Sequence, residues 1–438
     1  MITWREVAAG EDGLRLYRVD AEADAFGGGG GARGMLSPLD LILARSESTH
    51  LRRLQERFSE PGAPVGASTF SVACHVVSLP DLLFVTDSTY RSSAPEVFPG
   101  ALEAIARHEG RALAVRPIEV LYTHAHFDHA GGHRAVEALD GAARTLAHPF
   151  TARLAALVGK REGFLRTREG FLRDCGVEGD LDALAAEIRD HFLRLASTSG
   201  IDLAKSPWGA AEDGALRVDL EVDPEAGSVE RANGRIRVLR FDGHLPGHLC
   251  VLVDGRHLIT GDMWLPGTTS LVTPGTLGPL SGIPEDRFGL LRYLESNERL
   301  LASDLDECLS YPSHEVIFQN PKRMAMRDLE LLDERLDGVY AVLAEHRTGP
   351  LRVIDLASGG AEGLPLWKVG RNLHRLAIAH DEATAYVQDL TALGDLRPVA
   401  PGQWLWTGRS ALHDRTSATL KQARERYGQL EFRSRGLA

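Results

Sequence analysis

The chain has 438 residues and a formal net charge of −12, and this length allows two or three domains with a large buried core. The negative charge disfavours nonspecific attraction to phosphate backbones, although it does not exclude a local basic groove. No stretch approaches the ~18 uninterrupted apolar residues that a membrane span needs. The four cysteines are widely spaced, and the first residues lack the layout of a secretory signal. We therefore expect a cytoplasmic protein with no membrane segment.

The first part of the chain predicts alternating strands and helices. Residues 1–60 contain a glycine run at 27–31 that is typical of a flexible loop. Beyond about residue 66, the apolar pattern predicts a buried strand at 82–86, a helix at 101–114 and a second strand at 118–122. This second strand leads directly into a segment rich in histidine.

A helical insertion is expected at about 150–200. Apolar residues recur there at intervals of three and four, which indicates an amphipathic helix: Leu181, Leu184, Ile188, Phe192 and Leu195. Strands return at 236–241, 250–253 and 257–260. The last two flank Asp254-Gly255, a dipeptide that predicts a hairpin turn.

After residue 320 the pattern is mostly helical. It predicts a long helix around 329–343, two helices near 366–379 and 382–393 with Gly394 as a stop, and a hairpin at 398–406. This order predicts a winged-helix-like domain at 321–438, following a first domain at 1–320. Because the stretch 376–396 has no Lys or Arg, we expect this domain to have a packing role and not to bind nucleic acid.

The strongest chemical signal is the segment 123–132, THAHFDHAGG. Residues two apart in an extended segment point the same way, so His124 and His126 can reach one metal ion together. Where the strand gives way to a helix, Asp128 and His129 can turn towards a second ion. Imidazole and carboxylate groups are suitable zinc ligands. The spacing H-x-H-x-D-H arises by chance in only about one such sequence in a thousand.

Three later residues follow predicted strand ends, where ligands carried on loops are expected. They are His248 in the segment LPGHL, Asp262 at the end of the strand 258–262, and His314 after Pro312-Ser313. His244 lies four residues before His248 and competes with it as a ligand. The Pro-Gly-His context favours His248.

Taken in this order, the ligand motifs resemble the metallo-β-lactamase superfamily over about residues 66–320. The resemblance implies an α+β fold, a four-layer αββα sandwich, with residues 1–320 as the catalytic domain. It assigns one metal to His124, His126 and His248, and the other to Asp128, His129 and His314, with Asp262 bridging the two. Asp87 matches the family's buried aspartate, and we expect it to orient a ligand or the metal-site loop from behind.

The resemblance also implies a metal-dependent hydrolase with two divalent cations. Such a pair lowers the pKa of a bridging water and makes hydroxide available near neutral pH. Asp128 is the expected catalytic residue, orienting this nucleophile and shuttling its proton. Zinc is the default metal for these ligands, and iron or manganese would also fit.

The substrate is the least constrained part of the prediction, because one fold serves many reactions. The tail resembles a subgroup that includes glyoxalase-II-like thioester hydrolases, polyketide-releasing thioesterases and a winged-helix endoribonuclease. We expect hydrolysis of a thioester or a related activated ester or lactone, on a small-molecule or carrier-bound acyl substrate. The alternatives are phosphodiester cleavage by an enzyme of the same superfamily, a mononuclear iron enzyme that oxidises sulfur, and a non-enzymatic regulator.

Two structural questions stay open from the sequence. The insertion at 150–200 and the loop 263–266 either cover a pocket for an acyl chain or belong to the ordinary core. Nothing in the sequence decides whether the protein forms a homodimer.

Overall fold

The computed structural model describes residues 2–24, 69–158, 169–174, 216–358 and 373–429, with short gaps at 11, 90–93, 95, 114–115, 140–142, 225–227, 267–269, 271 and 315. The glycine run at 27–31 and the amphipathic segment at 181–195 lie outside the described residues. Of the predicted insertion, the structure describes helices α6 (Pro149–Val158) and α8 (Glu169–Asp174). Among the described helices, none is both long and apolar enough to span a membrane.

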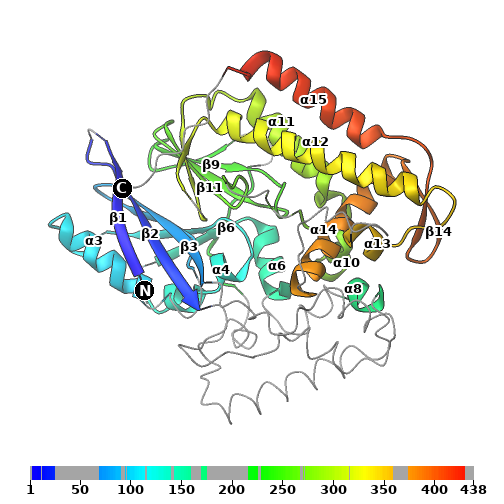
Figure 1. The fold of residues 1–438 in the computed structure, drawn as a ribbon. Helices are drawn as coiled ribbons and strands as arrows, with labels where there is room; N and C mark the ends of the chain where they lie inside the picture. Colours follow the sequence, from blue (N-terminus) through cyan, green and yellow to red (C-terminus); the bar gives the residue numbers. More distant parts are fainter. Residues whose placement is uncertain are drawn as a thin grey trace, which may run out of the picture.

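Two β-sheets lie face to face at the centre of the described structure (Figure 1). The described strands of the first sheet lie in the order β1 (Ile2–Ala9), β2 (Arg15–Asp24), β3 (Thr69–Ser78), β4 (Leu83–Thr86), β5 (Ile118–Tyr122), β6 (Ala143–Ala147) and β7 (Leu220–Glu221). Those of the second lie in the order β13 (Phe318–Gln319), β12 (Leu309–Pro312), β11 (His257–Gly261), β10 (Leu249–Val253), β9 (Ile236–Arg240) and β8 (Ser228–Arg231).

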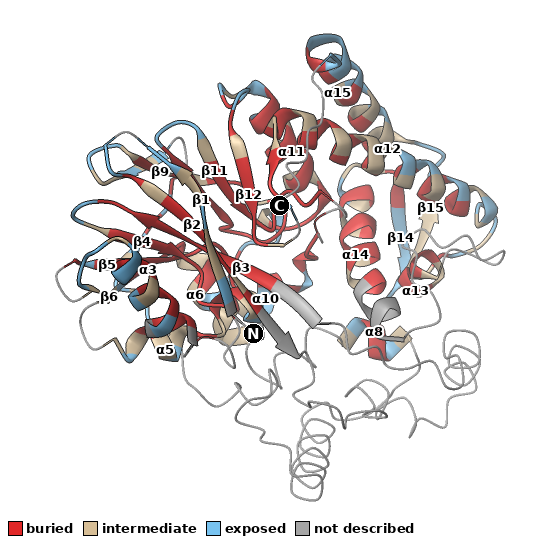
Figure 2. Cartoon of the chain, turned by 60° about the vertical axis from the view of Figure 1, so that its left-hand side comes forward, coloured by how far each residue is buried: buried red, intermediate tan, exposed pale blue. Residues whose placement is uncertain are grey.

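Alternating side chains of each strand serve two different cores, as the two-residue period of a strand requires. In β10, Leu249 and Val251 pack between the two sheets together with Phe84 and Leu121 of the first sheet. Cys250 and Leu252 of β10 point the other way, into the cluster that the outer helices complete. Figure 2 shows buried residues along the strands of both sheets.

Helices cover the outer faces of both sheets. On the first sheet, the helical segment η1 (Glu96–Ala101) and helix α3 (Leu102–His108) pack against β2–β5. On the second sheet, α11 (Leu290–Ala302) and α12 (Pro321–Glu345) supply much of the apolar layer. The layer order is therefore αββα, as predicted. Short helical segments among the described residues include α4 (Phe127–Ala130), α5 (His133–Glu137), η5 (Gly275–Leu277), α10 (Gly278–Ser281), η6 (Glu285–Arg287) and α13 (Val353–Ala357).

The C-terminal residues share a continuous apolar cluster with the second sheet. They comprise α12, α13, helix α14 (Leu373–Ala392), the hairpin β14 (Leu396–Ala400) and β15 (Gln403–Trp406), and helix α15 (Ala411–Tyr427). The prediction of two helices at 366–379 and 382–393 was wrong, because α14 continues through 379–382, where no glycine or proline interrupts it. Gly394, at φ +78, follows the helix end as predicted. The winged-helix assignment stays a prediction.

Burial decides whether the loop 263–266 covers a pocket or belongs to the core. Met263 and Trp264 are fully buried and belong to the apolar cluster between the second sheet and the helices. The indole N–H of Trp264 donates to Asn297 of α11 at 3.0 Å. Of the two interpretations that the sequence left open, these residues therefore fit the ordinary core.

Both sheets present strand ends to the same region. In the first sheet β4 and β5 are parallel, and in the second β11 and β12 are parallel, so the carboxyl ends of each pair meet at one edge. The backbone N–H of Leu249 donates to the carbonyl of Thr123 at 2.8 Å, which joins the two sheets there. The candidate ligands follow these strand ends.

Candidate metal centre

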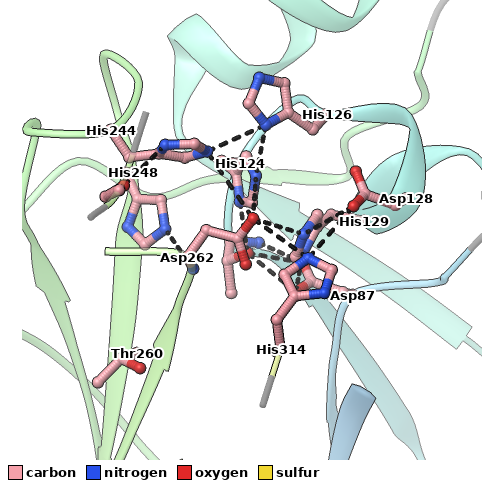
Figure 3. Close-up of polar contacts among 12 residues, drawn as sticks. Asp87, His124, His126, Asp128, His129, His244, His248, Thr260, Asp262 and His314 are labelled. Carbon is pink, nitrogen blue, oxygen red and sulfur yellow. Dashed lines mark hydrogen bonds and ion pairs between the residues drawn. The ribbon is translucent and has the colours of Figure 1, made fainter. Parts of the chain in front are cut away.

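Two groups of histidine and aspartate side chains converge at the edge where the strand ends of the two sheets meet (Figure 3). One consists of His124, His126, His244 and Asp262, and the other of Asp128, His129, Asp262 and His314. Within each group the ligand atoms lie within 4.8 Å of one another. Asp262 belongs to both groups. The structure therefore brings together six of the seven predicted ligands and places the predicted bridging residue between them.

The local backbone explains how one short segment serves both groups. His126 is extended, with φ −64 and ψ 151, and α4 begins at the next residue. The backbone N–H of His129 donates to the carbonyl of His126 at 3.0 Å as the helical turn closes. The extended part directs His124 and His126 to the first group, and the turn directs Asp128 and His129 to the second, as predicted from the spacing.

Asp262 is central to the geometry. Its Oδ2 lies 3.2 Å from Nε2 of His129 and 3.4 Å from Nε2 of His314. The same oxygen lies 3.8 Å from Nε2 of His124 and 3.9 Å from Nε2 of His244. One carboxylate is thus within reach of both groups.

The structure corrects one predicted ligand, since it places His244 in the position that the sequence analysis gave to His248. Nε2 of His244 lies 3.0 Å from Nδ1 of His126, and Nε2 of His124 lies 3.1 Å from the same atom. The backbone N–H of Asp262 donates to Nε2 of His248 at 3.3 Å. His248 is therefore buried behind the cluster, with this nitrogen already used.

The physical reason lies in the loop between β9 and β10. The backbone N–H of Phe241 donates to the carbonyl of His248 at 2.9 Å, which keeps His248 at the base of the loop. His244 lies in the middle of this loop, and its Nε2 faces His126 of the first group. The Pro-Gly pair between the two histidines turns the chain, and this local context does not by itself tell which histidine faces the metal site.

Asp87 lies behind the two groups, as predicted. Its carboxylate accepts hydrogen bonds from the backbone N–H of Thr123 at 2.7 Å and from Nδ1 of His129 at 2.9 Å. The Thr123 hydroxyl lies 2.9 Å from Asp87 and 3.0 Å from Nδ1 of His124. Asp87 is fully buried and has a positive φ of 64, a conformation that costs a residue other than glycine energy and is often retained at functional sites.

His244 has supporting residues that the sequence analysis missed. The Ser270 hydroxyl lies 2.9 Å from Nδ1 of His244, and the Thr273 hydroxyl donates to the His244 carbonyl at 2.8 Å. Both side chains are buried. Because they follow β11 in an irregular segment, no periodicity or motif marks them. Their role depends on a contact that only the fold creates.

The electrostatic environment differs between the two groups. Burial, reinforced by neighbouring histidines, lowers the pKa of His124 well below its usual range and that of His126 to about 3. Burial opposes charge at His314 too, but the carboxylates of Asp262 and Asp128 raise its pKa to about 10. Burial would raise the pKa of Asp128, yet His129 and His314 hold it at about 2. In the second group, carboxylates therefore favour the protonated imidazole, and a bound cation would displace that proton.

These residues fit a pair of divalent cations. His124 and His126 are neutral at pH 7, as metal-ligating imidazoles must be. Oδ1 of Asp262 is buried and has no hydrogen-bond partner among the described residues, which is costly unless a cation or water satisfies it. A mixed set of imidazoles and carboxylates is suited to zinc, and also to iron or manganese.

Known structures share this arrangement of sheets and helices. The chain is similar to a metallo-beta-lactamase family protein from Thermus thermophilus, with a TM-score of 0.50 and 21% sequence identity over 77% of this chain and 94% of that chain. It is also similar to a beta-lactamase domain protein from Burkholderia ambifaria, with a TM-score of 0.52 and 19% identity over 77% of this chain and 87% of that chain. No protein-family model and no curated protein matches the chain. The chain thus has the metallo-β-lactamase fold, which confirms the predicted core, whereas its assignment to a glyoxalase-II-like subgroup stays a prediction.

Proposed function

We propose that the protein is a hydrolase that uses two divalent metal ions held by the two groups of side chains. The observation that carries the proposal is that both groups share Asp262. Within each group, the ligand atoms lie within 4.8 Å of one another. One ion would be held by His124, His126 and His244, and the other by Asp128, His129 and His314. The fold supplies the strand ends that bring these residues together.

Bound divalent cations would lower the pKa of water and polarise a substrate carbonyl. The protein's own contribution is to hold the ligands in place and to manage a proton. Asp128 is only partly buried, whereas His129 beside it is fully buried. We therefore assign Asp128 the task of orienting the attacking water and accepting its proton. Hydrolysis transfers the hydroxyl of water to the acyl carbon and leaves a proton on the released group.

For the substrate we propose a thioester, or a related activated ester or lactone, with an apolar acyl part. Large apolar side chains are exposed at few positions of the described residues, and two of these lie beside candidate ligands. Phe127, between His126 and Asp128, is 51% exposed, and Val316, two residues after His314, is 39% exposed. Apolar surface beside a polar centre suits an acyl chain better than a charged phosphodiester.

A further small apolar cluster lies next to the first group. Ala125 and Leu245, the neighbours of candidate ligands in the sequence, pack there with Leu154 of α6 and with Phe288. This cluster makes one flank of the centre apolar and holds the ligand-bearing segments against α6. It is consistent with a substrate whose reacting carbonyl meets the metal ions while its chain lies on apolar surface.

The proposal is tested by assaying the zinc-loaded protein against acyl-thioesters, lactones and bis-nitrophenyl phosphate. We expect thioester or ester hydrolysis that a chelator abolishes and added zinc restores. The Asp128→Ala variant should lose turnover while keeping its fold by circular dichroism. Cleavage of the phosphodiester alone would contradict the proposed substrate class, and activity that persists in the metal-free protein would contradict the proposed mechanism.

A further inference from the structure

Helix α14, in the C-terminal part of the chain, is hydrogen-bonded to the segment that follows the metal-site strand β11. The buried carboxylate of Asp389 accepts hydrogen bonds from the backbone N–H groups of Leu290 and Leu291, the latter at 3.0 Å. These are the first residues of α11, whose N–H groups have no partner within the helix. Next to Asp389, the side-chain oxygen of Gln388 accepts the N–H of Gly275 at 2.8 Å. Two neighbouring residues of α14 therefore fix two points of the segment 270–291.

The approach of Asp389 to this segment requires a glycine at position 289. Gly289 has φ +97, and a Cβ there would lie 2.6 Å from Oδ2 of Asp389. A larger residue would clash with the carboxylate and adopt a strained backbone. The N–H of Gly289 donates to the carbonyl of Thr273 at 3.1 Å. A shift of Asp389 would therefore move Gly289, and with it the hydrogen-bonded Thr273.

Thr273 is in direct contact with a candidate metal ligand. Its hydroxyl donates to the carbonyl of His244 at 2.8 Å, and Ser270 of the same segment contacts Nδ1 of His244 at 2.9 Å. A metal-ligating imidazole is oriented by the hydrogen bond at its other nitrogen. With Nδ1 turned to Ser270, Nε2 of His244 faces His126 and the centre.

A second route connects the start of α11 to the same ligand by packing. Tyr293 lies in the first turn of α11, and its Cδ2 would be 2.7 Å from a Cβ added to Gly243, the residue before His244. A shift of the α11 start would therefore press on the backbone of the His244 loop. The hydrogen-bonded route through Thr273 and the packing route through Tyr293 both start where Asp389 holds the first residues of α11.

We infer that Asp389 is a positioning residue for the first metal site, acting through the segment 270–291 to orient His244. The inference rests on the proposed function, since it requires that His244 binds a metal. According to this inference, α14 in the C-terminal part of the chain sets the metal affinity of one of the two sites. Changes in residues that orient metal ligands usually reduce affinity by about 10–100-fold. We expect about tenfold here, because Asp389 acts through intervening residues.

Asp395 provides a matched control. It too is a buried aspartate near the end of α14, and it caps a helix in the same way, accepting the N–H groups of Ala411 and Leu412 at 3.0 and 3.1 Å. Its carboxylate also accepts the hydroxyl of Tyr340 at 2.6 Å. These partners belong to α15 and α12, and none lies in the segment 270–291. Loss of Asp395 should therefore destabilise the fold without a selective effect on one metal site.

The test is a competition titration of the full chain against a chromophoric zinc chelator, combined with absorption spectroscopy of the cobalt-loaded protein. The variants are Asp389→Ala, Asp389→Asn, Gln388→Ala and Asp395→Ala. We expect Asp389→Ala to weaken one of two zinc sites about tenfold and to alter the cobalt bands of that site. Asp389→Asn should recover most of the affinity, because an amide oxygen accepts the same two N–H groups. Gln388→Ala removes only the hydrogen bond to Gly275 and should weaken the same zinc site by less than Asp389→Ala does.

The outcomes separate this inference from the proposed function. If the unaltered chain binds no zinc, the proposed function fails, and the inference fails with it. If the unaltered chain binds two zinc ions and both Asp389→Ala and Gln388→Ala keep its affinities, the inference alone is overturned. An equal loss in Asp395→Ala would also overturn it, since the effect would then reflect general destabilisation. If Asp389→Ala does not fold, the comparison of Gln388→Ala with Asp395→Ala decides by the same criteria.

Discussion

Nδ1 of His129 donates a hydrogen bond of 2.9 Å to Oδ2 of Asp87, inside the protein and away from the metal centre. The same carboxylate accepts the Thr123 hydroxyl, which in turn lies 3.0 Å from Nδ1 of His124. His129 and His124 belong to different groups. A single buried carboxylate thus fixes the tautomer of one ligand in each candidate metal site.

Replacing Asp87 should weaken both metal sites. We expect Asp87→Asn to fold, because asparagine tolerates the left-handed backbone at this position, and to lose zinc affinity by about 10–100-fold. A chelator competition titration measures the change. The control is Glu119→Gln, which alters a carboxylate of the same sheet that is paired with Arg231 and should leave zinc affinity unchanged. Unaltered affinity in Asp87→Asn would contradict the role assigned to Asp87.

The exchange of His244 for His248 in the ligand set can be tested directly. We expect His244→Ala to bind about one metal ion fewer than the unaltered chain, since it removes a ligand that faces the centre. We expect His248→Gln to keep its full metal content, because glutamine can still accept the N–H of Asp262. Elemental analysis of the purified variants decides between them. The opposite pattern would restore His248 as the ligand.

The sequence predicted the parts of the site that local geometry controls. The two-residue spacing of His124 and His126, followed by a helical turn at Asp128, predicted two groups from a single segment. Asp262 and His314 were found because each follows a strand. His244, Ser270 and Asp389 were not assigned, since their roles depend on how a loop, an irregular segment and a distant helix pack against one another.

The fold was predicted with similar limits. Strands β4, β5, β9 and β11 were found within a residue or two of their observed ends, because apolar runs between turn residues mark them well. Near residue 380 the prediction divided one helix into two. Apolar residues there continue on the buried face of α14, and burial of this face against the core keeps the helix intact.

Phe127 provides a test of the apolar substrate. We expect Phe127→Ser to lower kcat/KM for a long-chain acyl-thioester by about tenfold, because each methylene that loses its apolar contact costs about 0.8 kcal/mol. Hydrolysis of an acetyl thioester should change little. Val399→Ser is the matched control, since Val399 is an exposed apolar residue on the β14–β15 hairpin. An equal loss for short and long chains would show that Phe127 does not contact the acyl part.

The buried carboxyl of Asp328 should make stability depend on pH. Burial raises its pKa to about 8 despite the hydrogen bond from Tyr293. The folded chain therefore retains this proton at pH values where the unfolded chain has lost it, so its contribution is largest below about pH 4 and is lost as the pH rises to about 8. The free energy of unfolding should fall by up to about 1.4 kcal/mol per pH unit in this interval from this group.

Asp328→Asn should remove that contribution, because asparagine is neutral and its oxygen can still accept the Tyr293 hydroxyl. Denaturant unfolding at pH 6, 7 and 8 measures the difference from the unaltered chain. Glu334→Gln, at an exposed position of the same helix, should follow the unaltered profile. Parallel profiles for Asp328→Asn and the unaltered chain would show that Asp328 does not titrate in this range.

The number of metal ions per chain tests the central claim most directly. The protein is stripped with a chelator, dialysed against excess zinc, freed of unbound metal and measured by elemental analysis. Two zinc ions per chain are expected, falling to about one in His314→Ala, because Asp128, His129 and His314 form one of the two groups that share Asp262. One zinc ion or none in the unaltered chain would contradict the account.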